Sequence, residues 1–462
     1  MELTSYSQAI TYLESFIPDP SRKFPGEAGL KRMSYFMNLL NNPQLAYSTI
    51  HVAGTSGKGS TSTMIAKILS TKYQVGLHTS PHISDIRERI AINGQMISKE
   101  DFVLILNDLI SSIEKTGNQK WGSPSYFEIL TAMAFVYFKS ERVDVAVIEV
   151  GMGGRWDGTN IIHPTVAVIT SIGLDHTQIL GDTIEKIASE KAGIIKPHIP
   201  VITGVDQPSV IQIIQDVCAK NDSNQIRLFK DFNYAAISVT ESGSDFDYRG
   251  LHTYDKIHLS LLGEFQIRNA AVAIRAVEEW EKINDITSLS HTAGTEISEG
   301  KIKSVLSAIH VPGRMEIVSK KPLVVLDGAH NGDKATALAH ALGQIYPKKR
   351  IISIVAIKGD KDAAAILCSL SQVSTQFIFP VFRTMTDVGV GDFYHPKDLE
   401  KIIRSTNPRM TVMIESDVHK AFRTAQRIAG KDDVILITGS LYLVGEMMKE
   451  FKNSINLDNK RC

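Results

Sequence analysis

The chain has 462 residues, and 50 Lys and Arg balance 50 Asp and Glu to a formal net charge of zero at pH 7. Because no net positive field is available to attract polyanions, a broad nucleic-acid or acidic-membrane surface is not expected. The sequence shows neither a signal peptide nor an apolar run of about 18 residues, and its three cysteines (Cys218, Cys368 and Cys462) suit neither a disulfide framework nor a zinc site, so a cytoplasmic protein is expected.

The chain is longer than the single-domain proteins that usually form one hydrophobic core, which predicts two domains. Short β-rich apolar runs alternate with helical patterns, as in parallel sheets with crossover helices. In chain order, strands are predicted at 48–54, 143–151, 165–173, 200–205, 322–330, 350–359, 376–382, 411–416 and 432–440. The polar region 231–260 predicts hairpins on the first domain, and the Ser/Thr/Gly-rich stretch 283–301 precedes a boundary near residue 309. The predicted fold class is therefore α/β, with domains at 1–308 and 309–462.

The stretch HVAGTSGKGSTS, residues 51–62, lies where a predicted strand turns into a helix. The Walker A pattern needs a glycine five residues before the Gly-Lys pair, but that position is Val52. Even so, Gly54, Gly57 and Gly59 would let backbone N–H groups hold phosphate oxygens at a helix start, with Lys58 reaching the β- and γ-phosphates. A tight strand-to-helix turn with an exposed lysine is the alternative.

The unusual spacing of this loop resembles the GTNGKGS loop of folylpolyglutamate synthases and dihydrofolate synthases, members of the Mur ligase superfamily. Ser56 stands where that family has asparagine. The resemblance runs from about residue 10 to ILITGSLYLVGE, and it implies a P-loop-type parallel-sheet ATPase domain followed by a smaller Rossmann-like α/β domain. It also implies that the loop binds ATP through Gly54, Thr55, Ser56, Gly57, Lys58, Gly59 and Ser60.

Two segments carry further polar residues after predicted strands. In LHTSPHISDIRERIAING, Ser80 offers a hydroxyl at a strand end, although a solvated loop fits equally well. In DVAVIEVGMGG, Glu149 lies deep in a buried strand, where a carboxylate needs a cation or a hydrogen-bond donor. A structural salt bridge is the alternative. The resemblance to the family's TSPHL and EVGLGGRLDATN segments implies that Ser80 and Glu149 ligate magnesium.

Two more candidate ligands follow. His176 ends TVAVITSIGLDH, where a packing role is the ordinary interpretation, but the resemblance to GLDH implies a second magnesium site. Lys191 falls on the apolar face of the helix that Ile184, Ile187 and Ala188 define, so it would lose its charge easily, unless its amine snorkels to water. The resemblance of EKAGIIKP to EKAGI implies that Lys191 is carbamylated and supplies magnesium with an oxygen ligand. Lys58, His176 and Lys191 are then the candidate catalytic residues.

Other candidates come from the resemblance alone. Asp157 and Gly158 in GGRWDGTN, Ser125 in SYFE and Arg32 in EAGLKRM match segments that border the family's folate or pterin pocket, although Ala28 replaces a leucine. Ser125 with Glu128 also fits a helix capping box, and both roles are compatible. For ATP, the resemblance adds four residues outside the loop, for which capping, packing and turn roles are the alternatives: Asn269, Arg314, Asp327 and His330.

The resemblance implies an ATP-dependent ligase that adds L-glutamate to dihydropteroate, to the glutamate tail of tetrahydrofolate, or to both, through an acyl phosphate. Mg²⁺ is the expected cofactor and ATP a substrate. The expected partners are small molecules (ATP, L-glutamate, dihydropteroate or reduced folate), without nucleic acid or membrane, and the protein is expected to be a monomer. Residues 1–308 would bind ATP and folate, and 309–462 would form the glutamate-ligase domain.

Two alternatives remain open. A cell-wall Mur ligase would carry an extra domain of about 100 residues ahead of the loop, and Lys58 comes too early for it. A nucleotide-binding regulatory module without turnover is the other alternative, against which the retention of Ser80, Glu149, His176 and Lys191 speaks.

Overall fold

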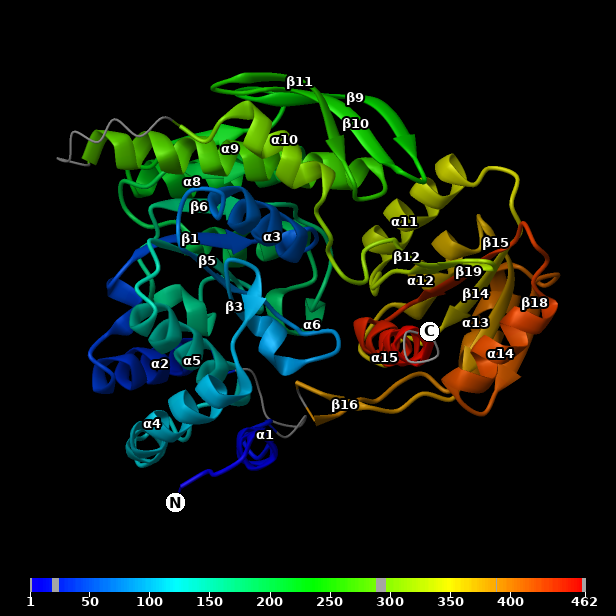
Figure 1. The fold of residues 1–462 in the computed structure, drawn as a ribbon, viewed down its shortest axis with the longest axis horizontal. Helices are drawn as coiled ribbons and strands as arrows, with labels where there is room; N and C mark the ends of the chain where they lie inside the picture. Colours follow the sequence, from blue (N-terminus) through cyan, green and yellow to red (C-terminus); the bar gives the residue numbers. More distant parts are fainter. Residues whose placement is uncertain (1, 19–24, 288–295, 388, 459–462) are drawn as a thin grey trace.

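The computed structural model describes residues 2–18, 25–287, 296–387 and 389–458. Cys462 and the middle of the Ser/Thr/Gly-rich stretch, 288–295, lie outside the described residues. Two α/β units lie side by side, each built on its own sheet (Figure 1). No helix in the described part of the chain is long and apolar enough to cross a membrane.

An eight-stranded sheet forms the first unit, in the order β4-β3-β2-β5-β1-β6-β7-β8. Neighbours from β2 to β8 pair in parallel, whereas β3 and β4 form an antiparallel edge. The strands are β1 (Ser48–Ala53), β2 (Val75–His78), β3 (Ile90–Ile92), β4 (Gln95–Met96), β5 (Val145–Glu149), β6 (Val166–Ile169), β7 (Val201–Thr203) and β8 (Gln225–Arg227). The four strands predicted in this half are confirmed.

Helices cover both faces of this sheet. Alternate residues of β5 enter different cores, Val147 with α3 and α9 and Ile148 with α2, α4 and α5, as the period of two in a strand requires. The helices are α1 (Tyr6–Glu14), α2 (Glu27–Leu39), α3 (Lys58–Leu69), α4 (Lys99–Gly117), α5 (Tyr126–Ser140), α6 (Thr177–Leu180), α7 (Ile184–Lys191), α8 (Pro208–Lys220), α9 (Glu264–Thr287) and α10 (Glu299–Ser307).

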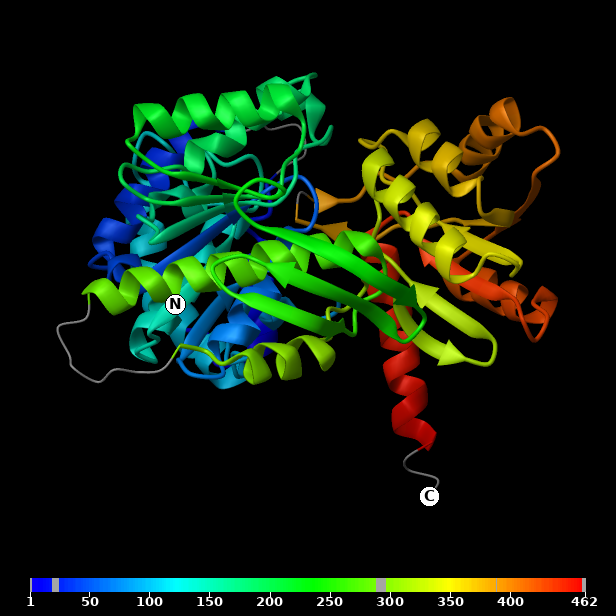
Figure 2. The same cartoon turned by 90° about the horizontal axis from the view of Figure 1, so that it is seen from above.

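The hairpins predicted at 231–260 are confirmed as a three-stranded antiparallel sheet, which lies along α9 (Figure 2). Its strands are β9 (Asn233–Thr240), β10 (Gly243–Arg249) and β11 (Thr253–Leu259). The region is more regular than its polar composition suggests, because Phe246, Tyr248 and Ile257 face inward and join the core of α3 and α9.

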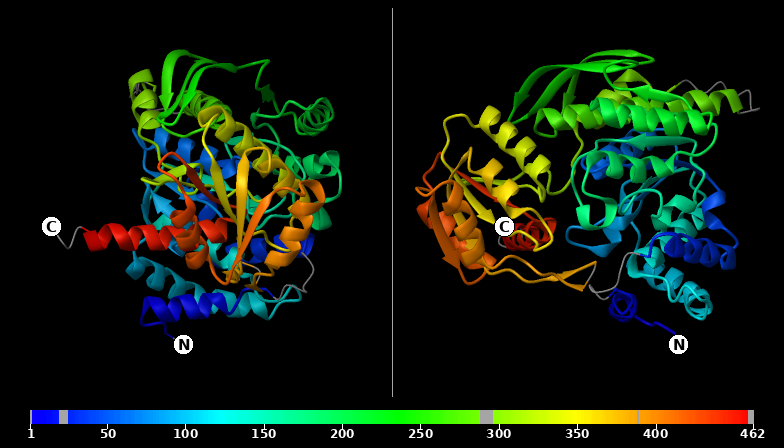
Figure 3. Two further views of the ribbon diagram at one scale, coloured as in Figure 1. Left: turned by 90° about the vertical axis from the view of Figure 1, so that its right-hand side faces the viewer. Right: turned by 180° about the vertical axis from the view of Figure 1, so that it is seen from behind.

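A six-stranded sheet forms the second unit, in the order β12-β13-β19-β14-β15-β18. Its five parallel strands confirm the prediction: β13 (Leu323–Leu326), β14 (Ile351–Val355), β15 (Ser374–Pro380), β18 (Thr411–Glu415) and β19 (Val434–Thr438). The antiparallel β12 (Glu316–Lys320) and the hairpin of β16 (Met385–Thr386) and β17 (Gly389–Val390) were not predicted. The helices are α11 (Gly332–Ile345), α12 (Ala363–Leu370), α13 (Pro396–Thr406), α14 (Val418–Ile428) and α15 (Leu441–Asp458), the last of which projects from the body (Figure 3).

Parallel strands bring the chemistry to one edge of each sheet, because side chains that follow them gather at their carboxyl ends. Gly54 follows β1, Glu149 ends β5 and Asp175 comes after β6, while Asp327 follows β13 of the second sheet. Asp175 hydrogen-bonds Asn331, so these two edges meet between the units.

Candidate active site between the two sheets

The loop after β1 has the geometry of an anion cradle. Gly57 has φ +82, in the left-handed region, and a Cβ there would overlap the Asn269 side-chain amide. This position therefore needs glycine, and Asn269, on the first turns of α9, lies against the loop. No side chain of the described residues caps α3, which leaves its first N–H groups free to face an anion.

Two lysines converge on this loop. Lys58 Nζ and Lys191 Nζ both donate to the carbonyl oxygen of Gly54, at 3.2 Å and 2.9 Å. Burial and the charge of Lys58 lower the pKa of Lys191 to about 7. Lys191 ends α7, and its position on the buried face of that helix confirms the predicted helical pattern. The two amines share one acceptor, so each retains donors that could face an anion at the loop.

Glu149 lies beside the same loop. Its Oε2 accepts the Ser80 N–H at 3.1 Å, and it would stand 3.6 Å from a Cβ on Gly59. Burial raises the pKa of Glu149, an effect that the charge of Lys58 opposes. The structure thus brings Ser80 and Glu149 together at the start of α3.

His176 lies on the neighbouring loop and precedes α6 with φ 50. Burial and the charge of Lys361 lower its pKa to about 3, so the ring is neutral at pH 7. Its Nε2 lies 3.9 Å from Asp175 Oδ1. Within the described ranges, no group of three or more His, Cys, Asp and Glu side chains is gathered as a metal site.

The candidates from the second unit lie in two neighbouring segments, Asp327 and His330 in the turn after β13 and Arg314 in the loop before β12. Asp327 is buried and accepts the N–H groups of Met315 at 2.9 Å and Ala329 at 2.8 Å, and burial raises its pKa. Arg314 donates to the Gly313 carbonyl at 3.2 Å. Asp327 therefore braces the loop that holds Arg314.

His330 belongs to the turn after β13. Its Nδ1 donates to the Gly328 carbonyl at 2.9 Å, so Nε2 is the atom that accepts Lys334 Nζ, also at 2.9 Å. Burial and the charge of Lys334 lower the pKa of His330 to about 4. The imidazole is thus neutral, and its hydrogen bond holds the Lys334 amine near Asp175 of the first unit.

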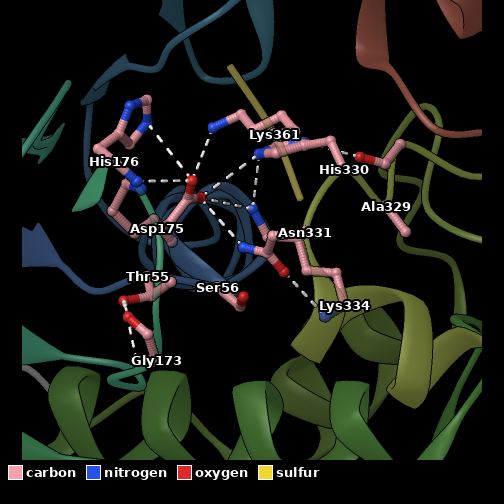
Figure 4. A network of polar contacts seen from close by, with 12 residues as sticks. Thr55, Ser56, Gly173, Asp175, His176, Ala329, His330, Asn331, Lys334 and Lys361 are labelled. Carbon is pink, nitrogen blue, oxygen red and sulfur yellow. Dashed lines mark hydrogen bonds and ion pairs between the residues drawn. The ribbon is translucent and has the colours of Figure 1, made fainter. Parts of the chain in front are cut away.

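The Asp175 carboxylate is the meeting point of the two units (Figure 4). Lys361 Nζ lies 2.6 Å from Oδ1, and Asn331 Nδ2 lies 3.0 Å from Oδ2. His330 and Lys334 stand farther away, at 3.7 Å and 3.8 Å. Sequence reasoning gave no role to Lys334 or Lys361, although each follows the end of a predicted strand closely, Lys334 after DGAHN and Lys361 in AIKGDKD.

The residues assigned to the pterin pocket gather around Glu128. Arg32 forms two hydrogen bonds of 2.8 Å with its carboxylate, and Ser125 shares the predicted capping box with it, which is confirmed. Gly158 packs against the Glu128 side chain as well, because a Cβ there would meet its Cγ at 3.3 Å.

Asp157, next in the chain to Gly158, is buried among donors. Its carboxylate accepts the Met152 N–H at 2.8 Å, the Thr159 N–H at 2.9 Å and the Thr159 hydroxyl at 2.6 Å. Burial raises its pKa, although these hydrogen bonds act in the opposite direction. The carboxylate therefore organises the turn that follows β5.

Two protein families match successive parts of the chain. The Mur ligase middle domain matches residues 52–277, which include the glycine loop, Glu149, His176 and Lys191. The dihydrofolate synthetase C-terminal domain matches residues 313–450, which include Arg314, the turn after β13, and Lys361.

Curated relatives and solved structures resemble the chain over nearly its whole length. The dihydrofolate synthase/folylpolyglutamate synthase of Bacillus subtilis (strain 168) is 34% identical over 456 residues, 97% of this chain and 100% of that protein. The Escherichia coli (strain K12) protein of the same name is 30% identical and covers 92% of this chain and 91% of its own. The structure of Mycobacterium tuberculosis folylpolyglutamate synthase complexed with ADP superposes with a TM-score of 0.86 at 31% identity, covering 96% of this chain and 98% of that one. By sequence and fold together, the chain belongs to the folylpolyglutamate and dihydrofolate synthase family, built from a Mur ligase middle domain and a dihydrofolate synthetase C-terminal domain.

Proposed function

We propose that the protein is an ATP-dependent ligase that joins L-glutamate to dihydropteroate, to the glutamate tail of tetrahydrofolate, or to both. One observation carries this proposal: Lys58 and Lys191 converge on the Gly54 carbonyl, at the uncapped start of α3, and face a second unit that presents Lys334 and Lys361. A triphosphate suits this site, because the first N–H groups of α3 and the Lys58 side chain can bind phosphate oxygens. The names of the relatives and the ADP in the Mycobacterium tuberculosis complex support it.

The reaction makes an amide from a carboxylate and an amine. The substrate carboxylate attacks the γ-phosphorus of ATP, the bond to the ADP oxygen breaks, and an acyl phosphate forms. The glutamate amine then attacks the acyl carbon, and phosphate leaves with the bonding electrons while the amine loses a proton. The chain need supply no nucleophile, so it acts by positioning and by charge.

Each candidate residue has a proposed part in this reaction. Residues 54–60 hold the phosphates through backbone N–H groups, with Lys58 offsetting the charge that grows on the transferred group. Asn269, Arg314, Asp327 and His330 complete the nucleotide site from α9 and the second unit. Arg32, Ser125, Asp157 and Gly158 border the pterin. The proposed domains, 1–308 and 309–462, would close on the substrates between them, with turnover by a monomer in the cytoplasm.

Magnesium fits the residues beside the loop. Glu149 supplies a buried carboxylate, the kind of oxygen ligand that Mg²⁺ prefers, and Gly59 leaves space between that carboxylate and the loop. We assign Ser80 and Glu149 to one ion and His176 to a second, with a carbamate on Lys191 as a further oxygen ligand. Bound there, the ions would neutralise phosphate charge.

The environment of Lys191 supports its carbamylation. Carbon dioxide reacts only with a neutral amine, whose lone pair attacks the carbon while one proton leaves to solvent. A pKa of about 7, set by burial and Lys58, gives such an amine at neutral pH. Carbon-13 NMR of the folded protein under labelled carbon dioxide should show one carbamate signal that Lys191→Ala abolishes. A bare ammonium in a crystal with magnesium and ATP would contradict it.

The proposed function is tested by ADP release with purified protein, ATP, magnesium and L-glutamate. Either dihydropteroate or tetrahydrofolate is added as the acceptor, and a reaction without glutamate is the control. Glutamate-dependent ADP release with both acceptors would support a bifunctional enzyme. Release with neither acceptor, from protein that binds ADP, would leave a nucleotide-binding module without ligase activity.

A further inference from the structure

A buried ion pair ties the two units together at the edge of the candidate site. Asp175 follows β6 of the first sheet, whereas Lys361 follows β14 of the second, and their charged atoms are 2.6 Å apart. Asn331, which caps α11, donates to the other oxygen of the same carboxylate at 3.0 Å. One side chain of the first unit therefore holds two separate loops of the second (Figure 4).

The pair is hard to break. The Asp175 and Lys361 side chains are each 9% exposed, so removing either partner would leave the other charge buried and unpaired, which is strongly destabilising. Each oxygen of the Asp175 carboxylate has its own partner in the second unit, Lys361 at Oδ1 and Asn331 at Oδ2, so this one buried side chain contacts both loops.

Asp175 also orders the first unit locally. Its Oδ1 accepts the N–H of His176 at 3.0 Å, which supports the left-handed backbone conformation of that residue, with φ 50, a conformation uncommon for residues other than glycine. Two residues earlier, Gly173 exchanges hydrogen bonds of 3.1 Å with the Thr55 hydroxyl of the glycine loop. A shift of Asp175 would therefore move His176 and disturb the loop that carries Lys58.

We propose that Asp175 and Lys361 form a positioning pair, which sets the edge of the second unit, with Lys334 and His330, against the glycine loop in the arrangement that phosphoryl transfer requires. Neither residue needs to touch the reacting atoms for this role. The inference rests on the proposed function, because its kinetic readout presupposes ligase turnover.

A second buried ion pair between the units provides a comparison. Arg89 Nη2 lies 2.7 Å from each carboxylate oxygen of Asp387, and the Arg89 side chain is fully buried. Its other neighbours are His82 and the Tyr126 ring, rather than the glycine loop. Loss of this pair would loosen the contact between the units without moving the loop that carries His176.

The experiment compares Asp175→Asn, Lys361→Met, their double variant and Lys361→Arg, with Asp387→Asn as the second-pair variant. Lys186→Met serves as the control, because its ion pair with Asp182 lies at the surface. Four quantities are measured: kcat, KM for ATP, ADP affinity by calorimetry, and the radius of gyration by X-ray scattering. Thermal unfolding shows which variants fold.

We expect each single variant to lower kcat by about 100-fold, the cost of misplacing catalytic groups by about 1 Å. ADP affinity should fall by a smaller factor than kcat, because the backbone N–H groups that hold the phosphates belong to the first unit and only the contacts from the second unit are displaced. The double variant should lose no more than either single one, because the two residues act as one unit. Lys361→Arg should recover part of kcat, and Asp387→Asn should lower it by less than about 10-fold.

Several results would contradict the proposed positioning role of Asp175 and Lys361. Losses that multiply in the double variant would show independent roles, and an Asp387→Asn variant that matches Asp175→Asn in every quantity would show a general clamp. An unchanged kcat in folded Lys361→Met would also contradict the proposed positioning role. If the wild-type protein has no turnover, the proposed function fails instead, and scattering of Lys361→Met still tests the pair: an unchanged radius of gyration contradicts it.

Discussion

Two groups of candidate residues in the first unit differ in how their charges are satisfied. Around the glycine loop, Lys58 and Lys191 compete for one carbonyl, and Glu149 has a pKa raised by burial. Around Glu128, by contrast, Arg32 forms a two-point ion pair, and the Asp157 carboxylate nearby accepts three hydrogen bonds. The first group is left with unmatched charge, while the second is matched within the protein.

The difference indicates what each group does for the protein. Charges that the fold leaves unmatched destabilise it and are available to a charged ligand, whereas matched buried charges become costly only when one partner is removed. Substitutions near the glycine loop should therefore lower activity while changing the free energy of unfolding little. Substitutions around Glu128 should mainly lower the free energy of unfolding.

The largest expected effect is that of Lys58→Ala. Removing the cation that faces the phosphates should lower glutamate-dependent ADP release by about 1,000-fold, in the range known for charged groups in phosphoryl transfer. The midpoint of thermal unfolding should stay near that of the wild type, because Lys58 contributes little packing. Lys67→Ala, at the other end of α3, is the control. Turnover at the wild-type rate in folded Lys58→Ala would remove the basis for the nucleotide site.

Arg32→Met should show the opposite pattern. It leaves Glu128 buried without its cation, which should cost about 3 kcal/mol of unfolding free energy, measured by urea denaturation. Lys31→Met, one residue earlier, removes an exposed pair with Glu27 and should cost less than about 0.5 kcal/mol. Equal stability of the two variants would show that the matched network around Glu128 stabilises nothing.

Asp157→Asn separates the two folate activities. The Asp157 carboxylate is expected to accept hydrogen bonds from the pterin ring as well as from the N–H and O–H groups of its own turn. The reaction with dihydropteroate should then fall by about 10-fold more than tail extension of tetrahydrofolate. Steady-state kcat/KM for both acceptors is the measurement, with exposed Asp182→Asn as the control. A parallel loss of both activities would assign Asp157 to the turn alone.

The smallest expected effect concerns the pH dependence of stability. Burial, together with Lys58, Arg314 and Lys361, lowers the pKa of Lys334 to about 7 against the pull of Asp175. Above that pH the folded protein has released a proton that the unfolded chain still binds up to its usual pKa of 10.5, so the free energy of unfolding rises with pH. Lys334→Met should reduce this rise by about 1 kcal/mol between pH 7 and pH 8.

Urea denaturation at both pH values measures the effect, and Lys348→Met, at an exposed position of the same unit, is the control. The same slope in wild type and Lys334→Met would show that the buried amine does not titrate in this window.

Local patterns along the chain were enough to predict the α/β class, nine strands and the glycine loop, because apolar periodicity and glycine spacing involve only neighbouring residues. They also led to Lys191 on a buried helical face and to the capping box of Ser125 and Glu128, both of which depend on residues within one or two turns. The family resemblance then supplied roles for residues that no local pattern distinguishes.

The contacts between charged side chains became evident only from the folded structure. Lys361 lies 186 residues from Asp175, and Arg32 lies 96 residues from Glu128, so no spacing in the sequence signals either contact. The antiparallel β12 and the β16–β17 hairpin were missed for a related reason, since their short strands are ordered by pairing and not by their own pattern. Ion pairs form where two folded surfaces come together, and that depends on the packing of whole sheets, which local propensity does not encode.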